Sequence, residues 1–512
     1  MNNLPEEIIY HILNYLENTI DVINFSLSNK FYRNLIIKNK EIFNCISTFN
    51  NKYLNEIDKL NIIGKLKVDL YNSNIYDLSN VRNIKKINLS NCYRIIDLSM
   101  LRNCEELNLS HCINLIDVSS LSKIKKLNLS YCDGIKDVSM LGNCEELNLS
   151  SCNNISDVSG LVKVKKLNLS YCGITDVSML GNCEELNLTR CERITDVSVL
   201  GNVKNLNLSY CDGIKDVSML GNCEELNLYY CQNISDVNNL GNVKKLNLIY
   251  CDKIIDVSML GNVEELYLSN SINITDVSGL VNVKKLDLSR CFNIKDVSKL
   301  GNVKELNLSE CENISDVSAL GNVKKLNLAH CYNISDVSML VNVKKLDLSY
   351  CNNISDVSML GNCEKLKLIG CKKIIDVSSL GNVKELNLTD CYNISDVSML
   401  VNVRKLNLKF CINISDVSML GNCEELELTG CYKIVNVNML GKVKKLNLSG
   451  CQNILDVSAL GNVKELNLSY CKNITDVSAL VNIKELDISH CINIKVYWEI
   501  NKIFINQVLL VN

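Results

Sequence analysis

A short pattern of apolar and polar residues repeats along most of the chain. Its first part alternates, as in LNLSYC from Leu127 to Cys132, and its second part spaces apolar residues more widely, as at Ile135, Val138 and Leu141. Alternation over a few residues is typical of a strand with one buried face, whereas the wider spacing is typical of inward anchors on a return segment. Each unit is therefore predicted to be one short strand followed by a returning turn.

The pattern has a nearly constant period. Counted from Val68, it occurs in 22 copies, the last at Leu486, and most steps are twenty residues long. One of the two nineteen-residue steps, Leu167 to Leu186, loses a residue in a turn and keeps the strand. One unit is too small to bury its own apolar face, so the units are predicted to stack side by side with parallel strands.

This pattern resembles the leucine-rich repeat, in a short form of its cysteine-containing variety, over residues 68 to about 494. In NVKNLNLSYC, the inward positions of the family pattern are filled by Val203, Leu206, Leu208 and Cys211. The resemblance implies an α/β solenoid with a parallel concave β-sheet of about 22 short strands. On the convex side we expect a turn of helix or irregular chain, and the concave sheet is the expected binding face.

Cysteine recurs at one place in nearly every unit and could be a metal ligand, a disulfide half, a nucleophile or a packing group. Cys144 and Cys152 lie eight residues apart, roughly 26 Å along an extended strand, too far to share a metal ion. Cysteines of neighbouring units would have Cβ atoms about 4.8 Å apart, wider than the ~3.8 Å of a disulfide. Because Ser271 replaces one of them, we predict small packing groups with a weak hydrogen bond to the loop backbone, and no metal or cofactor.

Charge and the amino terminus narrow the class of partner. The chain of 512 residues has 54 basic and 57 acidic residues and a net charge of -3, so no positive excess indicates nucleic acid or an anionic membrane.

The start, MNNLPEEIIYHIL, lacks the features of a secretory signal, and no apolar run approaches membrane-spanning length. Thiols kept reduced also indicate a reducing compartment. We expect an intracellular protein, cytoplasmic or nuclear.

Polar positions on the outward face also follow the period. The pairs before the strand alternate in charge, as in Lys85 and Lys86 followed by Glu105 and Glu106. Opposite charges would then lie across adjacent strands, an arrangement worth ~0.2–1 kcal/mol per pair. Asparagine at the centre of most strands, as at Asn247, is predicted to form a structural amide ladder.

The position just before the recurring cysteine varies freely and is predicted to lie on the outward face of the strand. Tyrosine and arginine anchor many protein interfaces. The candidate contact stripe on the concave face is Tyr171, Arg190, Tyr210, Tyr230, Tyr250 and Arg290. An exposed strand position that merely drifts would vary in the same way. A stripe of this mixed composition suits a protein or peptide partner better than a small molecule.

The segment before the repeats, residues 4–36, has the spacing of three short helices. Apolar residues recur on one helix face, as at Ile8, Ile12 and Leu16, and Pro5 suits a first helical turn. This segment resembles an F-box, a small all-α domain, over about forty residues. The resemblance implies binding to the SKP-type linker of cullin-RING ubiquitin ligases through Leu4, Pro5, Ile8, Ile12 and Leu13. The plain alternative is a helical cap for the solenoid.

The domain plan that follows is an F-box-like domain at 1–45, a linker or cap at 46–66, the solenoid at 67–495 and a C-terminal cap at 496–512. We expect an adaptor that presents a captured protein to an SCF-type ligase; the alternative is a binding scaffold with no ligase role. An enzyme is not expected, because no carboxylate pair, Ser/His/Asp set or phosphate-binding loop stands apart from the repeat. Asp137 and Asp157 fill a recurring turn position.

Overall fold

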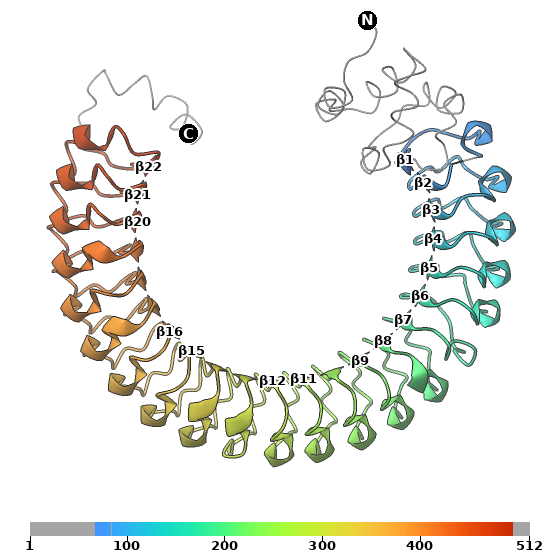
Figure 1. Cartoon of the computed structure of the whole chain (residues 1–512), viewed down its shortest axis with the longest axis horizontal. Helices are drawn as coiled ribbons and strands as arrows, with labels where there is room; N and C mark the ends of the chain where they lie inside the picture. The colour runs from blue at the N-terminus through green and yellow to red at the C-terminus, as the bar shows by residue number, and fades with distance from the viewer. Residues whose placement is uncertain (1–66, 83, 495–512) are drawn as a thin grey trace, which may run out of the picture. The chain divides into compact units, whose positions relative to one another are not determined.

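Stacked repeats make up the described part of the chain in the computed structural model, which covers residues 67–82 and 84–494. The chain divides into two units, with the boundary between Cys251 and Asp252. Each unit is a solenoid with one three-residue strand per repeat and, in nearly every repeat, one short 3-10 helical turn. Within each unit the strands line the inner, concave side and the helical turns the outer side (Figure 1). The predicted solenoid with a concave sheet is thus confirmed for each unit.

The strands of the first unit are β1 (Lys67–Asp69), β2 (Lys86–Asn88), β3 (Glu106–Asn108), β4 (Lys126–Asn128), β5 (Glu146–Asn148), β6 (Lys166–Asn168), β7 (Glu185–Asn187), β8 (Asn205–Asn207), β9 (Glu225–Asn227) and β10 (Lys245–Asn247). The strands of the second unit are β11 (Glu265–Tyr267), β12 (Lys285–Asp287), β13 (Glu305–Asn307), β14 (Lys325–Asn327), β15 (Lys345–Asp347), β16 (Lys365–Lys367), β17 (Glu385–Asn387), β18 (Lys405–Asn407), β19 (Glu425–Glu427), β20 (Lys445–Asn447), β21 (Glu465–Asn467) and β22 (Glu485–Asp487).

Helical turns of the first unit are η4 (Ser79–Val81), η5 (Ser99–Leu101), η6 (Ser119–Leu121), η7 (Ser139–Leu141), η8 (Ser159–Leu161), η9 (Ser198–Asn202), η10 (Ser218–Leu220) and η11 (Asn238–Leu240). Those of the second unit are η12 (Ser258–Leu260), η13 (Ser278–Leu280), η14 (Leu300–Asn302), η15 (Ser318–Asn322), η16 (Ser338–Leu340), η17 (Ser358–Leu360), η18 (Ser378–Asn382), η19 (Ser398–Leu400), η20 (Ser418–Asn422), η21 (Asn438–Leu440), η22 (Ser458–Leu460) and η23 (Ser478–Leu480).

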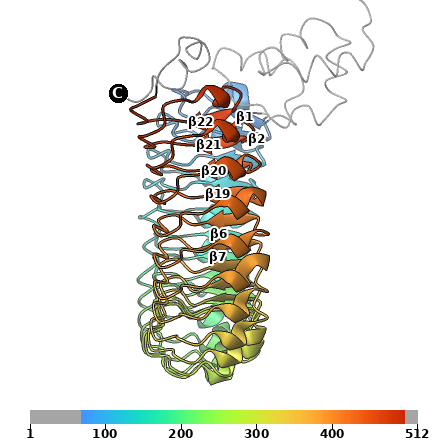
Figure 2. The ribbon, with the colours of Figure 1, turned by 90° about the vertical axis from the view of Figure 1, so that its left-hand side faces the viewer.

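Neighbouring strands within a unit pair in parallel and in a single register. In the first unit Leu226 of β9 lies opposite Leu246 of β10, and in the second Leu266 of β11 lies opposite Leu286 of β12. Seen from the side, successive repeats place their strands and turns one above another (Figure 2). A slip of one residue would turn every strand leucine outward, so burial of the leucines specifies the register.

The interior of each repeat is filled by the apolar residues that the period singled out. In the repeat around β8, the residues exposed by 2% or less are Val203, Leu206, Leu208, Cys211, Ile214, Val217 and Leu220. Ser209 is also buried, and the remaining positions of the repeat are half-buried or exposed. The alternating part and the widely spaced part of the pattern therefore enclose one continuous core between them.

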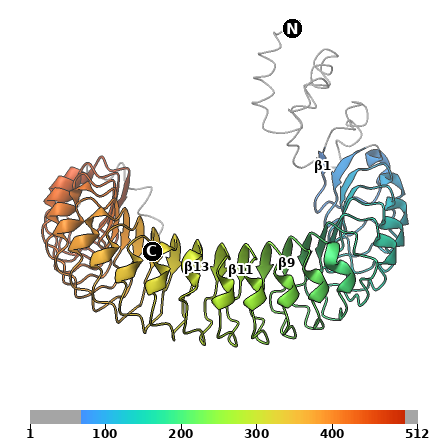
Figure 3. The same cartoon turned by 60° about the horizontal axis from the view of Figure 1, so that its bottom comes forward.

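The convex side of nearly every repeat carries a 3-10 turn, and an aspartate side chain usually accepts a hydrogen bond at the start of that turn. Asp216 Oδ1 accepts the backbone N–H of Ser218 at 2.9 Å, at the start of η10. This bond holds the pKa of the Asp216 carboxyl below its usual range. The expectation of one helical turn is confirmed, and the described residues hold no α-helix in the repeats. Figure 3 shows the turns carried on the outer side of the repeats.

The alternating charges meet across adjacent strands, as predicted. Lys126 Nζ lies 2.8 Å from Glu146 Oε1, and Lys166 Nζ lies 2.7 Å from Glu185 Oε1. These side chains are exposed to solvent, so each pair contributes at most about 1 kcal/mol. Their larger effect is to remove the repulsion that like charges would have on successive strands.

Candidate interaction surface

The outward asparagine of each strand builds the turn that follows it. Asn207 Oδ1 accepts the backbone N–H of Ser209 at 3.0 Å, and Asn227 Oδ1 accepts the N–H of Tyr229 at 3.0 Å. Such a bond from a side chain to the backbone two residues on is an Asx turn. The asparagine is structural, as predicted, but its usual partner is the turn of its own repeat. Bonds between strands, as an amide ladder requires, occur at some repeats: Asn307 Nδ2 donates to Asp287 Oδ1 at 3.0 Å.

The variable position lies in this turn and has left-handed backbone. Tyr210 and Tyr230 both have φ of 60°, and Tyr250 has φ of 62°. The strand of the last of these repeats, β10, ends at Asn247. The assignment of this position to the strand face was therefore wrong: it lies in the turn at the carboxyl-terminal edge of the sheet. Left-handed backbone costs a residue with a Cβ about 1–2 kcal/mol, so tyrosine is not favoured here by local preference.

Five residues of the candidate stripe come together in the first unit. Arg190 lies between two rings, with its guanidinium carbon 5.6 Å from the ring centre of Tyr171 and 4.5 Å from that of Tyr210. The ring centres of Tyr210 and Tyr230 are 5.1 Å apart, and those of Tyr230 and Tyr250 are 5.9 Å apart. A cation over an aromatic face and rings at these spacings attract one another. The candidate residues thus form a continuous side-chain array.

Tyr229 is a member of this array that sequence reasoning missed. It stands one place before the variable position, where most repeats have serine or threonine. Its ring centre lies 5.2 Å from that of Tyr210 and 5.8 Å from that of Tyr250. Its side-chain hydrogen bond with Tyr210 raises the pKa of Tyr229. The signal in the sequence was the paired tyrosines of LNLYYC. We call Tyr171, Arg190, Tyr210, Tyr229, Tyr230 and Tyr250 the aromatic row.

Arg290, the remaining candidate, lies in the second unit and is held differently. Its Nε lies 3.0 Å from Glu310 Oε1 on the next repeat. The same turn position further along carries a stacked pair, His330 and Tyr350, with ring centres 4.5 Å apart. The guanidinium of Arg290 is thus engaged by a carboxylate, whereas that of Arg190 lies against rings.

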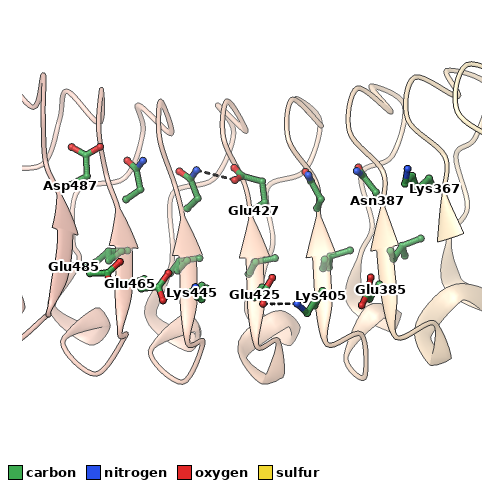
Figure 4. A pocket seen from close by; sticks show the side chains of 18 of the residues that line it. Lys367, Glu385, Asn387, Lys405, Glu425, Glu427, Lys445, Glu465, Glu485 and Asp487 are labelled. Carbon is green, nitrogen blue, oxygen red and sulfur yellow. Dashed lines mark hydrogen bonds and ion pairs between the residues drawn. The ribbon is translucent and has the colours of Figure 1, made fainter. Parts of the chain in front are cut away.

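A groove of about 670 Å³ runs along the inner face of the second unit, over strands β16 to β22 (Figure 4). Most strands place a lysine or glutamate there, and these side chains pair: Lys405 Nζ lies 2.7 Å from Glu425 Oε1. Asn447 Nδ2 donates to Glu427 Oε2 at 2.9 Å. The charges of the groove are therefore largely neutralised by its own side chains. Sequence reasoning did not single it out; its only signal was the replacement of asparagine at Lys367, Glu427 and Asp487.

The recurring cysteines are buried packing groups, as predicted. Cys231 is fully buried, and its Sγ donates to the backbone oxygen of Leu208 in the preceding repeat at 3.1 Å. Burial raises the pKa of the Cys231 thiol to about 12. Ser271, which replaces one cysteine, is also fully buried. Across residues 67–82 and 84–494, no three His, Cys, Asp or Glu side chains gather closely enough to hold a metal ion.

The predicted ligase-linker residues Leu4, Pro5, Ile8, Ile12 and Leu13 lie outside the residues that the structure describes, as do the two predicted caps. Within the part that it does describe, no helix has the length and apolar character needed to cross a membrane.

A family model described as Leucine Rich repeat matches residues 160–180, 340–360 and 462–481. Each of these segments contains one strand, β6, β15 or β21, together with the turn that follows it. The repeats are leucine-rich repeats. The described part of the chain is accordingly a leucine-rich-repeat scaffold of the kind that serves protein–protein interaction.

Three bacterial proteins are among the solved structures similar to this leucine-rich-repeat chain. An internalin of Listeria monocytogenes, InlF, is 18% identical over 78% of this chain and 93% of that chain, with a TM-score of 0.29. A leucine-rich-repeat protein of Leptospira interrogans is 15% identical over 74% and 99% of the two chains, with a TM-score of 0.44. The functional domain of InlJ of Listeria monocytogenes, which includes a cysteine ladder, is 18% identical over 79% and 73%, with a TM-score of 0.25. No curated protein matches the chain.

Proposed function

We propose that this protein is an adaptor that captures another protein on its leucine-rich repeats and brings it to a cullin-RING ubiquitin ligase. The observation that supports the capture surface is the aromatic row. Tyrosine and arginine are the residues most enriched among those that dominate interface energies. Here they contact one another and remain partly exposed.

The ligase half of the proposal rests on the amino-terminal resemblance to an F-box. Leu4, Pro5, Ile8, Ile12 and Leu13 match the residues with which that family binds the SKP-type linker. The second candidate function is a leucine-rich-repeat scaffold whose amino-terminal segment is a cap. The repeats themselves favour neither, because both would capture a protein in the same way.

The capture surface is tested by changing the aromatic row. A photo-crosslinking amino acid in place of Tyr230 is expected to trap a discrete protein partner in extracts. Tyr210→Ala with Tyr230→Ala should weaken the binding of that purified partner about 30-fold or more, because two central aromatic anchors are lost. Binding is measured by calorimetry, with Tyr93→Ala as the control, since Tyr93 is an exposed tyrosine outside the row. Equal effects of the control and the double variant would remove the aromatic row as the capture surface.

The ligase connection is tested with a purified SKP-type linker and the full chain. The intact protein should retain the linker on affinity beads, and Pro5→Ala with Ile12→Asp should abolish retention, because a charge would then lie on the predicted apolar face. Tyr210→Ala with Tyr230→Ala serves as the matched control and should leave linker retention unchanged. If the intact protein fails to retain the linker, the scaffold function replaces the adaptor function.

A further inference from the structure

The alternation of charge breaks down in the second unit, where the longest run of one sign is four lysines. Lys284, Lys304, Lys324 and Lys344 occupy the same position, just before strands β12 to β15. We call these four residues the lysine row. The backbone N–H of Lys304 donates to the oxygen of Lys284 at 3.0 Å, that of Lys324 to Lys304 at 3.0 Å, and that of Lys344 to Lys324 at 3.2 Å. The four lysines therefore lie on successive repeats, with strand β13 labelled in Figure 3.

Few carboxylates balance the lysine row. Lys284 Nζ lies 3.0 Å from Glu264 Oε2 on the preceding repeat. Within the described residues, Lys304, Lys324 and Lys344 form no ion pair. The adjoining positions are Lys285, Glu305, Lys325 and Lys345, and the one glutamate among them pairs with Lys325 at 3.4 Å. This part of the unit therefore presents a strip of exposed positive charge in a chain whose net charge is -3.

This arrangement opposes stability and needs another explanation. Strands lie about 4.8 Å apart, well within the ~8 Å over which physiological salt screens charge. Like charges directly across adjacent strands are destabilising. In the first unit the same position alternates, as at Lys125 and Glu145, whose charged atoms are 3.6 Å apart. A row that repels itself in the free protein gains most from an anion that binds along it.

We propose that the lysine row binds an acidic, extended segment of a partner protein running along the repeats. Strands β12 to β15 read KLD, ELN, KLN and KLD, so none carries an aromatic side chain on which a base could stack. Asp287 and Asp347 lie on the same outward face as Lys285 and Lys345, two residues further along their strands. Their carboxylates would repel a phosphate backbone that crossed the sheet. A narrow acidic peptide that follows the edge avoids them.

The test uses a fluorescein-labelled oligoglutamate peptide and the full chain, with binding followed by fluorescence anisotropy. Lys304→Glu with Lys344→Glu makes the charge alternate over the four positions of the lysine row. This variant should bind the peptide at least about tenfold more weakly, and its thermal midpoint should stay the same or rise. The matched control, Lys123→Glu with Lys163→Glu, makes the same change in net charge at exposed positions of the first unit and should bind like the unaltered protein.

Three results would overturn the proposal. One is equal weakening in the variant and the control, which would make the effect one of net charge alone. Another is tighter binding of a single-stranded RNA of matched charge than of the peptide. The third is unchanged peptide binding by Lys304→Gln with Lys344→Gln, a neutral variant that remains informative if the charge reversal misfolds. The aromatic row belongs to the other unit, so the two tests are independent. If the lysine row fails to bind the acidic peptide, the proposed capture surface is unaffected. If the aromatic row fails to bind a partner, the proposal for the lysine row is unaffected.

Discussion

The protein is expected to unfold cooperatively as the pH rises through about 10 to 11. The cause is its thiols. The described residues include 25 buried free cysteines. Burial raises the pKa of Cys152 and Cys231 from 9.0 to about 12. The same residues in an unfolded chain would ionise near the ordinary value.

The direction of this pH effect follows from the number of protons that the folded and unfolded chains bind. Below about pH 9 both states keep their thiol protons, and the stability of the folded state is undiminished. Between about pH 9 and about pH 12 the unfolded chain loses protons that the folded chain retains, so alkali favours unfolding. Each such thiol lowers the free energy of unfolding by about 1.4 kcal/mol per pH unit in that window. Because many thiols lie in one stack, their losses add. Circular dichroism and thiolate absorbance should change together.

The chain offers its own control for this pH dependence. Some repeats have a second cysteine before the strand where others, such as the repeat at Val203, have valine. The described second cysteines, all buried, are Cys104, Cys144, Cys183, Cys223, Cys363 and Cys423. Replacing all six by valine removes thiols whose pKa is raised by burial, and it keeps the apolar pattern of the repeat. The alkaline midpoint should move to higher pH. Thiolate absorbance rising near pH 9 with unchanged circular dichroism would refute the burial argument.

Leu208→Ala is expected to lower the free energy of unfolding by about 2–5 kcal/mol, the range for removal of a fully buried leucine side chain. Leu208 is 0% exposed, and its backbone oxygen also accepts the thiol of Cys231. A repeat stack depends on contacts between neighbours. The loss of stability should therefore be largest around β8 and β9. Denaturant unfolding gives the total effect. Hydrogen exchange gives its position.

An exposed isoleucine provides the matched control for this substitution. Ile116 is 72% exposed in the same unit, so Ile116→Ala removes apolar surface that is not part of the core. Its effect should stay within about 0.5 kcal/mol. Similar effects of the two substitutions, or exchange that rises evenly along the unit, would contradict the view that each strand leucine stabilises its own repeat and the next.

Much of the fold could be predicted because one constraint acts in every repeat. A period of twenty residues brings like positions together, so Leu226 must lie beside Leu246 if either is to be buried. The same argument predicted the pairing of Lys126 with Glu146 and the packing role of Cys231. For the candidate site, the period selected a column whose side chains lie against one another but assigned it to the wrong element. The missed residue, Tyr229, stood in a column whose other members are mostly small.

The sequence by itself determined which side chains of this protein face inward and which repeats lie side by side, because burial and period leave one consistent stacking. Only the tertiary structure decided how the variable residues are presented. The backbone N–H of Tyr210 donates to the oxygen of Tyr229 at 2.8 Å, and Asn207 closes the turn within its own repeat. The left-handed backbone at Tyr210 depends on both bonds, and one of them joins residues of different repeats. Local preference, which disfavours tyrosine there, could not have predicted it.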